Sequence, residues 1–389
     1  MTIPPSSFTE VPVLSLAAAR SPETKPAFLA QLRDALLSVG FMYISDTGLP
    51  DELVEQVIQQ THRFFDEDVL PLEEKERIEM KNQKSFLGWS RLDNETTAHH
   101  ADHREQLDLS TPHPIPEPDA PLYHNLLAPN QWPSPSRLPQ FRPVFEDYMR
   151  RMSDISTFFT SLIAEAIGLP ATTFDRFFDA SQQHKLKIVK YPEVDLSNLN
   201  GTPAPNNTNG ANAIARQGVG PHKDSMLTSY LLQCSPQPGL QAQNHRGNWV
   251  PVSPIAGTLV VAIGQGLEAV TGGVCASTTH RVLSPRKGQG PRFSCPFFQG
   301  VSYDAKFEEM DVPESVRRLK EEVDKRKSEG KRAQDVEFSF RKGMWGHLGE
   351  ATLANRVKSH PDVGERWYPE LLAKIREQQR KEALSKHAG

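Results

Sequence analysis

Two kinds of hydrophobic pattern alternate along the chain. From Gly218 to Phe298, short apolar runs are separated by Gly, Pro and Asn, a pattern typical of β-strands joined by turns. On either side of this stretch, apolar residues recur every three or four positions, which indicates amphipathic helices. The sequence therefore predicts a β-rich core between helical flanks. The expected elements are strands at Val11–Leu16, Phe41–Ile44 and His184–Tyr191, and helices at Pro26–Val39, Asp51–Phe65, Leu72–Met80 and Pro143–Gly168.

The rest of the chain predicts connections and a tail. Residues 111–143 are rich in proline and lack periodicity, so we expect a long surface connection there, which packing could order but which is not a fold of its own. Residues 304–389 have a charged, helical pattern that favours solvated helix faces. Residues of this tail that could dock it on the core are Trp345, Trp367, Tyr368, Leu371 and Leu372. The chain thus divides into an N-terminal region of helices and strands (1–180), a β core (181–303) and a C-terminal helical extension (304–389).

Strand length and turn frequency in the β core favour a double-sheet jelly roll. With the helical flanks on both sides, the predicted fold class is mixed α/β with an all-β core.

Composition narrows the class of protein. The 389 residues are enough for one large core or two modest ones. A formal net charge of −4 gives no electrostatic reason to expect nucleic acid or an anionic membrane surface, and no apolar run approaches the roughly 20 residues of a membrane span. Three cysteines are too few, and odd in number, for a disulfide framework. They fit a reducing compartment, so we expect a cytoplasmic protein. Its oligomeric state is left open.

Two histidines and one aspartate in the β core predict a metal site. His222 and Asp224 stand two positions apart in a β-like run, so their side chains leave the same strand face. His280 follows in another β-like run. Two imidazoles and one carboxylate on neighbouring strands leave open positions on a metal, an arrangement associated with non-haem Fe(II) oxygenases. Arg292 and Ser294 come next, again two apart.

Each of these short motifs also occurs elsewhere in the chain. His-x-Asp recurs at His100 and His360, and Arg-x-Ser recurs at Arg151 and Arg326. Both arginine copies lie in helical patterns, where residues two apart do not share a face. A proline follows His360 and would break a strand ladder, and His100 sits in a polar run with no strong strand character. Only the copy at His222 is followed by a distal histidine and Arg-x-Ser in β-like runs.

Longer segments carry a resemblance to a known family. They are KIVKYP (187–192), PHKDSMLT (221–228), GLQAQNHRGNWVPV (239–252), LEAVTGG (267–273), STTHRV (277–282) and PRFSCPFF (291–298), together with VPVLSL, LRDALLSVGFMYISDTGLP, FFDEDVLPLEEKERI and HREQLDL in the N-terminal third. With these segments the chain resembles the 2-oxoglutarate/Fe(II) dioxygenases of the isopenicillin N synthase-like family over most of residues 10–300. The resemblance implies a double-stranded β-helix with iron at its open mouth.

The resemblance also implies roles for individual residues. Three side chains would hold Fe(II), and three others would bind the co-substrate 2-oxoglutarate, which chelates the iron. The implied iron ligands are His222, Asp224 and His280, and the implied 2-oxoglutarate contacts are Arg292, Ser294 and Tyr191. The implied reaction uses O2 to oxidise a C–H bond of a small organic molecule, by hydroxylation, desaturation or ring closure. It releases succinate and CO2.

Two positions depart from the family pattern, and three residues are candidates for contacts with the substrate. Val189 stands where many relatives have Asn, and AIGQ (262–265) replaces the usual N-I-G-D, which we interpret as a turn variant. Lys187 shares the strand face of Tyr191 and could pair with an acidic substrate or be solvated at a strand end. Phe298 would share the face of Arg292 and could stack on the substrate or pack in the core. Arg104 lies in a segment that the resemblance places at the pocket rim.

Residues 195–218 form a polar, Asn/Gly/Pro-rich insertion immediately before the His222 strand. Its composition cannot supply a core, so we expect it to be mobile. Because it joins the strand of Tyr191 to the strand of His222, we expect either a lid that orders when substrate binds or a tolerated surface insertion.

Two alternative functions remain open from the sequence. One is an oxidase similar to isopenicillin N synthase, in which Arg292 and Ser294 hold the carboxylate of the substrate and no 2-oxoglutarate is used. The other is a zinc hydrolase with a His2Asp site, or a metal-binding protein without catalysis. A hydrolase would not need the Arg-x-Ser pair.

Overall fold

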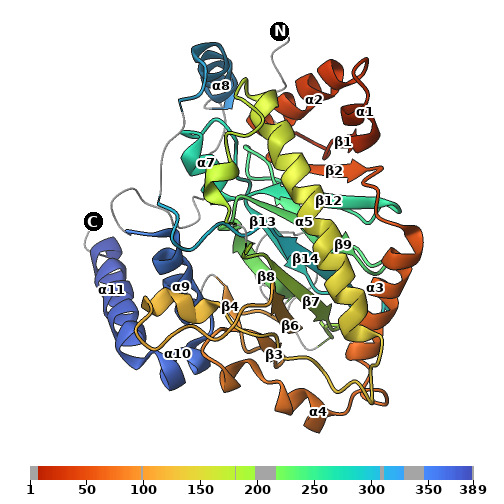
Figure 1. The fold of residues 1–389 in the computed structure, drawn as a ribbon, viewed down its shortest axis with the longest axis vertical. Coiled ribbons are helices and arrows are strands. Elements are labelled where there is room, and N and C mark those ends of the chain that lie inside the picture. Colours follow the sequence, from red (N-terminus) through yellow and green to blue (C-terminus); the bar gives the residue numbers. More distant parts are fainter. Residues whose placement is uncertain are drawn as a thin grey trace.

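A computed structural model describes residues 8–97, 100–179, 181–197, 216–306, 311–327 and 346–387. Two β-sheets form its centre, and helices surround them (Figure 1). Within the described residues, the larger sheet has eight strands in the order β1-β2-β12-β9-β14-β7-β6-β3, and the smaller has four in the order β11-β10-β13-β8. This arrangement confirms the predicted mixed α/β fold with an all-β core.

The strands of the larger sheet come from both sides of residue 180. They are β1 (Val13–Ser15), β2 (Phe41–Ser45), β3 (Gly88–Ser90), β6 (Glu105–Ser110), β7 (Lys185–Tyr191), β9 (Thr228–Gln233), β12 (Thr258–Ile263) and β14 (Arg292–Phe298). The smaller sheet contains β8 (Gln217–His222), β10 (Leu240–Gln243), β11 (Trp249–Pro251) and β13 (His280–Leu283), and β4 (Thr96–Thr97) pairs with β5 (His100–Ala101) in a separate hairpin. The N-terminal region is therefore hydrogen-bonded into the β core. The domain boundaries at residues 180 and 303 stay predictions.

The long helix α5 (Phe141–Ala166) crosses the outer face of the larger sheet, beside α2 (Lys25–Ser38) and α3 (Asp51–Phe64) (Figure 1). Its apolar stripe is buried as predicted, with Tyr148 and Phe159 in one hydrophobic cluster with the outward side chains of the sheet. The connection after α2 needs Gly40, because its φ is 64° and a Cβ there would lie 2.0 Å from the Ala276 carbonyl oxygen.

The remaining helices cover the edges. They are α1 (Leu16–Arg20), α4 (Leu72–Arg77), α7 (Gln265–Val270), α8 (Glu314–Lys327), α9 (Leu348–Ser359), α10 (Pro361–Trp367) and α11 (Pro369–His387), with single 3₁₀ turns at Met80–Asn82, Leu122–Leu126 and Asp175–Phe177. The predicted helix at Leu72–Met80 is thus shorter than expected. None of the described helices is long and apolar enough to cross a bilayer.

The C-terminal extension packs against the N-terminal region. Tyr368 and Leu372 share a buried cluster with Phe86 and with Tyr123 of the proline-rich connection, which is therefore partly core and not only a surface connection. Trp345 and residues 198–215 lie outside the described residues, so the role predicted for Trp345 and the mobile lid predicted within 195–218 stay predictions. The three cysteines are buried and free of disulfides, as expected.

Candidate active site

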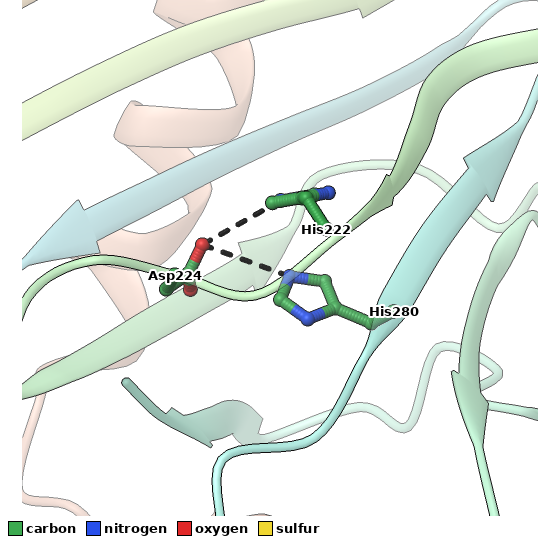
Figure 2. Close-up of side chains that lie close together, drawn as sticks. All are labelled: His222, Asp224 and His280. Atoms are coloured by element: carbon green, nitrogen blue, oxygen red, sulfur yellow. Dashed lines mark ion pairs between the residues drawn. The ribbon is translucent and has the colours of Figure 1, made fainter. Parts of the chain in front are cut away.

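Three side chains predicted to bind metal meet at one end of the smaller sheet. His222 ends β8 and His280 begins β13, and the two residues are cross-strand partners. Asp224 lies two residues beyond the end of β8, in the following loop and not on the strand as expected, yet its carboxylate faces both rings (Figure 2). Its Oδ1 lies 3.5 Å from Nε2 of His222 and 3.7 Å from Nε2 of His280. The three residues each offer one donor atom, and these three atoms all lie within 4.8 Å of one another.

Backbone carbonyls fix the orientation of both imidazoles. Nδ1 of His222 lies 2.8 Å from the carbonyl oxygen of Gly220, and Nδ1 of His280 lies 3.0 Å from that of Thr278. When each Nδ1–H donates to its carbonyl, each Nε2 keeps a free lone pair directed toward Asp224. Ser229 Oγ donates a hydrogen bond to the other carboxylate oxygen of Asp224. The three donor atoms are therefore held in place by partners outside the cluster.

The charges of the cluster follow from burial and from the neighbours. Burial and the adjacent His222 lower the pKa of His280 to about 4. Burial opposes the charge on Asp224, but His280, His222 and Ser229 outweigh it and hold the pKa of Asp224 below its usual value. Burial would also lower the pKa of His222, but Asp224 raises it above its ordinary value. At neutral pH the cluster therefore contains an ionised carboxylate and a neutral His280, the states in which these two groups bind a metal, whereas a metal at Nε2 of His222 would displace a proton that Asp224 stabilises.

The start of α7 is hydrogen-bonded to the loop that carries Asp224. The backbone N–H of Gln265 donates to the Asp224 carbonyl oxygen at 2.7 Å, and its side-chain amide donates to the Lys223 carbonyl oxygen at 3.2 Å. Gly264 packs so closely that a Cβ would lie 1.8 Å from the Met226 carbonyl oxygen. The AIGQ segment is thus more than the turn variant that the sequence indicated, because it positions Asp224.

The residues predicted to bind 2-oxoglutarate lie on the inner face of the larger sheet. Arg292 and Tyr191 are cross-strand partners on β14 and β7, and the Arg292 guanidinium lies 5.1 Å from the tyrosine ring centre. Val189 stands opposite Ser294 in the same pairing and is buried in an apolar cluster. Arg292 is only 1% exposed. Its Nη2 lies 3.2 Å from Oε1 of Gln233, while its Nε and Nη1 have no hydrogen-bond partner among the described residues.

A cavity of about 340 Å³, the size of a small-molecule site, connects these groups. All three candidate substrate contacts, Lys187, Phe298 and Arg104, line it. The β14 register is regular from Arg292 to Phe298, so Phe298 does share the face of Arg292. Arg104 is buried in an ion pair, with Nη2 2.7 Å from Glu95.

Lys187 is buried and paired with carboxylates, so the possibility that it is solvated at a strand end is wrong. Its Nζ lies 3.3 Å from Glu95 and 3.3 Å from Asp108, so it is neither solvated nor available as an isolated cation. These two acidic partners were not among the residues predicted for the site. Asp108 could have been recognised as a charge inside an apolar alternating strand, whereas Glu95 lies in a polar run that gives no such signal.

Asp102 is a further supporting residue that was not predicted for the site. Its Oδ1 accepts hydrogen bonds from the Gly220 N–H at 3.1 Å and from the Gln217 side chain at 3.0 Å, so it holds the strand that ends in His222. The His-x-Asp copy at His100 therefore supports the cluster through its aspartate, while His100 itself is exposed.

One wall of the cavity comes from α9 in the C-terminal extension. The residues that line it recur at helical spacing, a signal present in the sequence as a polar stripe: Thr352, Asn355, Arg356 and Ser359.

Comparisons with known proteins identify the family. A sequence model described as the 2OG-Fe(II) oxygenase superfamily matches residues 185–301, and one described as "non-haem dioxygenase in morphine synthesis N-terminal" matches residues 11–135. The chain is 63% identical to the 2-oxoglutarate-dependent dioxygenase frbJ of Dothideomycetidae sp. (strain 11243), over 96% of each chain. The chain belongs to the 2OG-Fe(II) oxygenase superfamily.

Two further likenesses are more distant. A homoarginine-6-hydroxylase of Oryza sativa subsp. japonica is 30% identical over 72% of this oxygenase and 79% of that protein. The crystal structure of a full-length Neurospora crassa protein in complex with alpha-KG and thymine superposes with a TM-score of 0.63, covering 81% of this chain and 96% of that one at 20% identity, which shows the fold alone. Together the comparisons favour a 2-oxoglutarate-dependent oxygenase over the synthase-like oxidase and the zinc hydrolase.

The oxygenase uses Fe(II) and 2-oxoglutarate, and the residues of the cavity fit both. Two imidazoles and a carboxylate with convergent donor atoms suit Fe(II) and leave coordination positions open. Nε and Nη1 of Arg292 and Oγ of Ser294 are buried without a hydrogen-bond partner among the described residues. Such groups are costly to leave unpaired, so they match the carboxylate of a bound oxo-acid.

Proposed function

We propose that His222, Asp224 and His280 hold the Fe(II) of this oxygenase. Support comes from the two Nε2 atoms and the carboxylate, which converge on one point, and from the carbonyls that fix each imidazole. Because the chain offers three donors there, positions remain for the oxo-acid and O2. When bound, the iron supplies the reduction of O2, coupled to decarboxylation of 2-oxoglutarate to succinate and CO2.

We propose further that Arg292, Ser294 and Tyr191 bind 2-oxoglutarate. The observation that carries this proposal is the buried, unpartnered edge of Arg292, Nε and Nη1, on the same strand face as the Ser294 hydroxyl, which also lacks a partner among the described residues. A planar guanidinium can donate two parallel hydrogen bonds to one carboxylate, and the hydroxyl can add a third. The Tyr191 side chain bounds this site on the β7 side.

The substrate of the oxygenase is a small organic molecule in this proposal, and the reaction oxidises one of its C–H bonds by hydroxylation, desaturation or ring closure. The size of the cavity supports this class of substrate. The rice relative, named a homoarginine-6-hydroxylase, and the Neurospora crassa protein, solved with thymine, are both associated with small molecules. Lys187, Phe298 and Arg104 are the proposed contacts on the sheet.

We propose that the oxygenase works in the cytoplasm, which its three free, buried thiols support. The expectations that it binds neither nucleic acid nor a membrane stay predictions.

Consumption of 2-oxoglutarate tests this function without knowledge of the substrate. Enzyme supplied with Fe(II), 2-oxoglutarate and air is assayed for O2 uptake and for succinate by mass spectrometry, with a panel of small organic molecules. We expect succinate to require both Fe(II) and 2-oxoglutarate. Oxygen uptake that is indifferent to 2-oxoglutarate would instead favour the synthase-like oxidase, and a Zn²⁺-dependent hydrolysis would favour the hydrolase.

A further inference from the structure

Most of the buried charges around the cavity are already paired. Nη2 of Arg104 lies 2.7 Å from Glu95 and 3.2 Å from Asp102. Nζ of Lys187 lies 3.3 Å from Glu95 and 3.3 Å from Asp108. These two cations face three carboxylates, so one negative charge remains for a third cation. A fourth cation in this part of the cavity finds all three carboxylates already matched by positive charges.

Two further cations do line the same cavity. Lys185 is 6% exposed, and its Nζ donates to the Leu126 carbonyl oxygen at 3.1 Å, without an ion pair to any described carboxylate. Nη1 of Arg356 on α9 lies 3.7 Å from Asp108, a carboxylate that Lys187 already shares. Burial, and then the charge of Arg356, lower the pKa of Lys185 to about 7. A buried and a partly buried cation that disfavour each other are stabilised by an anion between them.

The strand register places Lys185 in the same row across the larger sheet as Ser229, which contacts the proposed metal ligand Asp224. Lys185 pairs with Phe298 across β7 and β14, and Phe298 pairs with Ser229 across β14 and β9. Ser229 is the residue that donates to the Asp224 carboxylate. Lys185 and Ser229 are thus two strand spacings apart, about 10 Å between their backbones. Phe298 lies between them on the cavity face.

The same register separates Lys185 from the proposed 2-oxoglutarate site. Arg292 stands at the other end of β14, six residues from Phe298, which is about 20 Å along a strand. An anion at Lys185 would therefore be distinct from the carboxylate held by Arg292.

We propose that Lys185 and Arg356 bind an anionic group of the substrate, a carboxylate in the simplest case. This inference rests on the proposed function, because it places the substrate in the cavity of the oxygenase. The Arg356 guanidinium offers a planar fork to a carboxylate, and the Lys185 ammonium adds a point charge from the sheet. With its carboxylate held there, the rest of the substrate would lie across Phe298. A C–H bond a few ångströms from the carboxylate would then lie close to the cluster of His222, Asp224 and His280. The substrate class is then a small organic acid.

Matched pairs of acids and amides test this inference by direct binding. The Fe(II)–2-oxoglutarate enzyme is dialysed to equilibrium, without O2, against hexanoate, phenylacetate, indole-3-acetate and L-homoarginine, and against the primary amide of each. We expect retention of at least one acid and not of its amide. In Arg356→Gln and Lys185→Met, the affinity for that acid should fall about ten- to a hundredfold, because each removes a charge-assisted hydrogen bond.

Two further variants make the comparison specific. Arg356→Lys keeps the charge without the fork and should lose less affinity than Arg356→Gln. Lys358→Gln removes a cation from α9 that does not line the cavity and should bind the acid as wild type does.

The visible absorption band of the anaerobic Fe(II)–2-oxoglutarate enzyme is recorded on every sample. It reports folding and the proposed function separately from acid binding. Three results obtained with a normal band overturn the inference while leaving the proposed function intact. They are amides bound as tightly as acids, no acid bound at all, and wild-type acid affinity in both Arg356→Gln and Lys185→Met. Loss of the band in the wild type counts against the proposed function instead.

Discussion

The buried side chain of Arg292 has hydrogen-bond donors that no described residue satisfies, and leaving such donors unpaired costs free energy. It is buried, its pKa is lowered by burial, and two of its three nitrogens have no partner among the described residues. A buried guanidinium with unused donors is stabilised when an anion binds. This residue therefore links the fold of β14 to the binding of 2-oxoglutarate.

Replacement of Arg292 by leucine tests that link. We expect Arg292→Leu to weaken 2-oxoglutarate binding about ten- to a hundredfold, the value of one charge-assisted hydrogen bond of about 1.5–3 kcal/mol, and to leave iron binding intact. Ser294→Ala, which removes a neutral hydroxyl, should have a smaller effect. The dependence of succinate formation on 2-oxoglutarate concentration measures both variants. An unchanged dependence in Arg292→Leu would contradict the assignment.

Asp102 acts on the cluster through the backbone of β8. Its carboxylate accepts from Gly220, whose own carbonyl oxygen orients His222, and it lies 3.2 Å from Arg104. Asp102→Ala leaves a buried arginine short of a partner, so we expect the free energy of unfolding to fall by about 3–5 kcal/mol and iron binding to weaken. Urea denaturation measures the first effect. Asp154→Ala, on the exposed face of α5, is the control and should change stability by less than about 0.5 kcal/mol.

At the scale of elements, the loop between β8 and β9 is as important as the strands. Asp224 lies in this loop, and the start of α7 holds it through hydrogen bonds from Gln265 and close packing at Gly264. The strand pattern of the sequence could not reveal that arrangement, because it depends on a residue about forty positions away in the chain.

Gly264 offers a test of this packing. Gly264→Ala places a Cβ 1.8 Å from the Met226 carbonyl oxygen, so the loop must move and Asp224 with it. We expect this variant to bind Fe(II) much more weakly while its β-sheet circular dichroism is retained. Gly257→Ala is the matched control, because it has a φ of 71° but open space around it, and should cost only about 1 kcal/mol of backbone strain. Equal iron affinities in the two variants would contradict the role of this loop.

At the scale of the whole molecule, the C-terminal extension completes the cavity. The α9 wall includes Arg356, and α10 and α11 hold that helix against the N-terminal region. Tyr368 anchors the contact, since its ring stacks on Phe86 at 5.7 Å and its hydroxyl donates to the Lys84 carbonyl oxygen at 2.7 Å.

Truncation of Tyr368 should therefore loosen the cavity wall. We expect Tyr368→Ala to destabilise the protein by about 3–5 kcal/mol and to make the extension more sensitive to proteolysis, because a large buried aromatic is lost. Tyr368→Phe keeps the ring and should cost only about 1 kcal/mol, the value of one hydrogen bond. Limited proteolysis followed by mass spectrometry compares the two variants, and urea denaturation measures their stability. Equal cleavage of the extension in Tyr368→Ala and wild type would show that this docking is not needed.

Much of this architecture is predictable from the sequence, and the limits have physical causes. The helix at 26–39, the strand at 184–191 and the long helix before Gly168 follow from local periodicity, and the convergence of His222 with His280 follows from the family motif. The partners of Lys187 and the support that Asp102 gives to β8 depend on contacts across the larger sheet and the β4–β5 hairpin. No local pattern encodes them. Likewise, the polar stripe of α9 follows from helical spacing, but nothing local shows that it faces a cavity.

The most direct test of the account is an anaerobic titration of the enzyme with Fe(II) and 2-oxoglutarate, followed by visible absorption. We predict a band that requires both components and saturates at one iron per chain. The band should be absent in His222→Ala and in His280→Ala, and unchanged in His100→Ala, which alters an exposed histidine of a similar motif. A band that forms without 2-oxoglutarate, or one that survives His222→Ala but not His100→Ala, would contradict the assignment of the site.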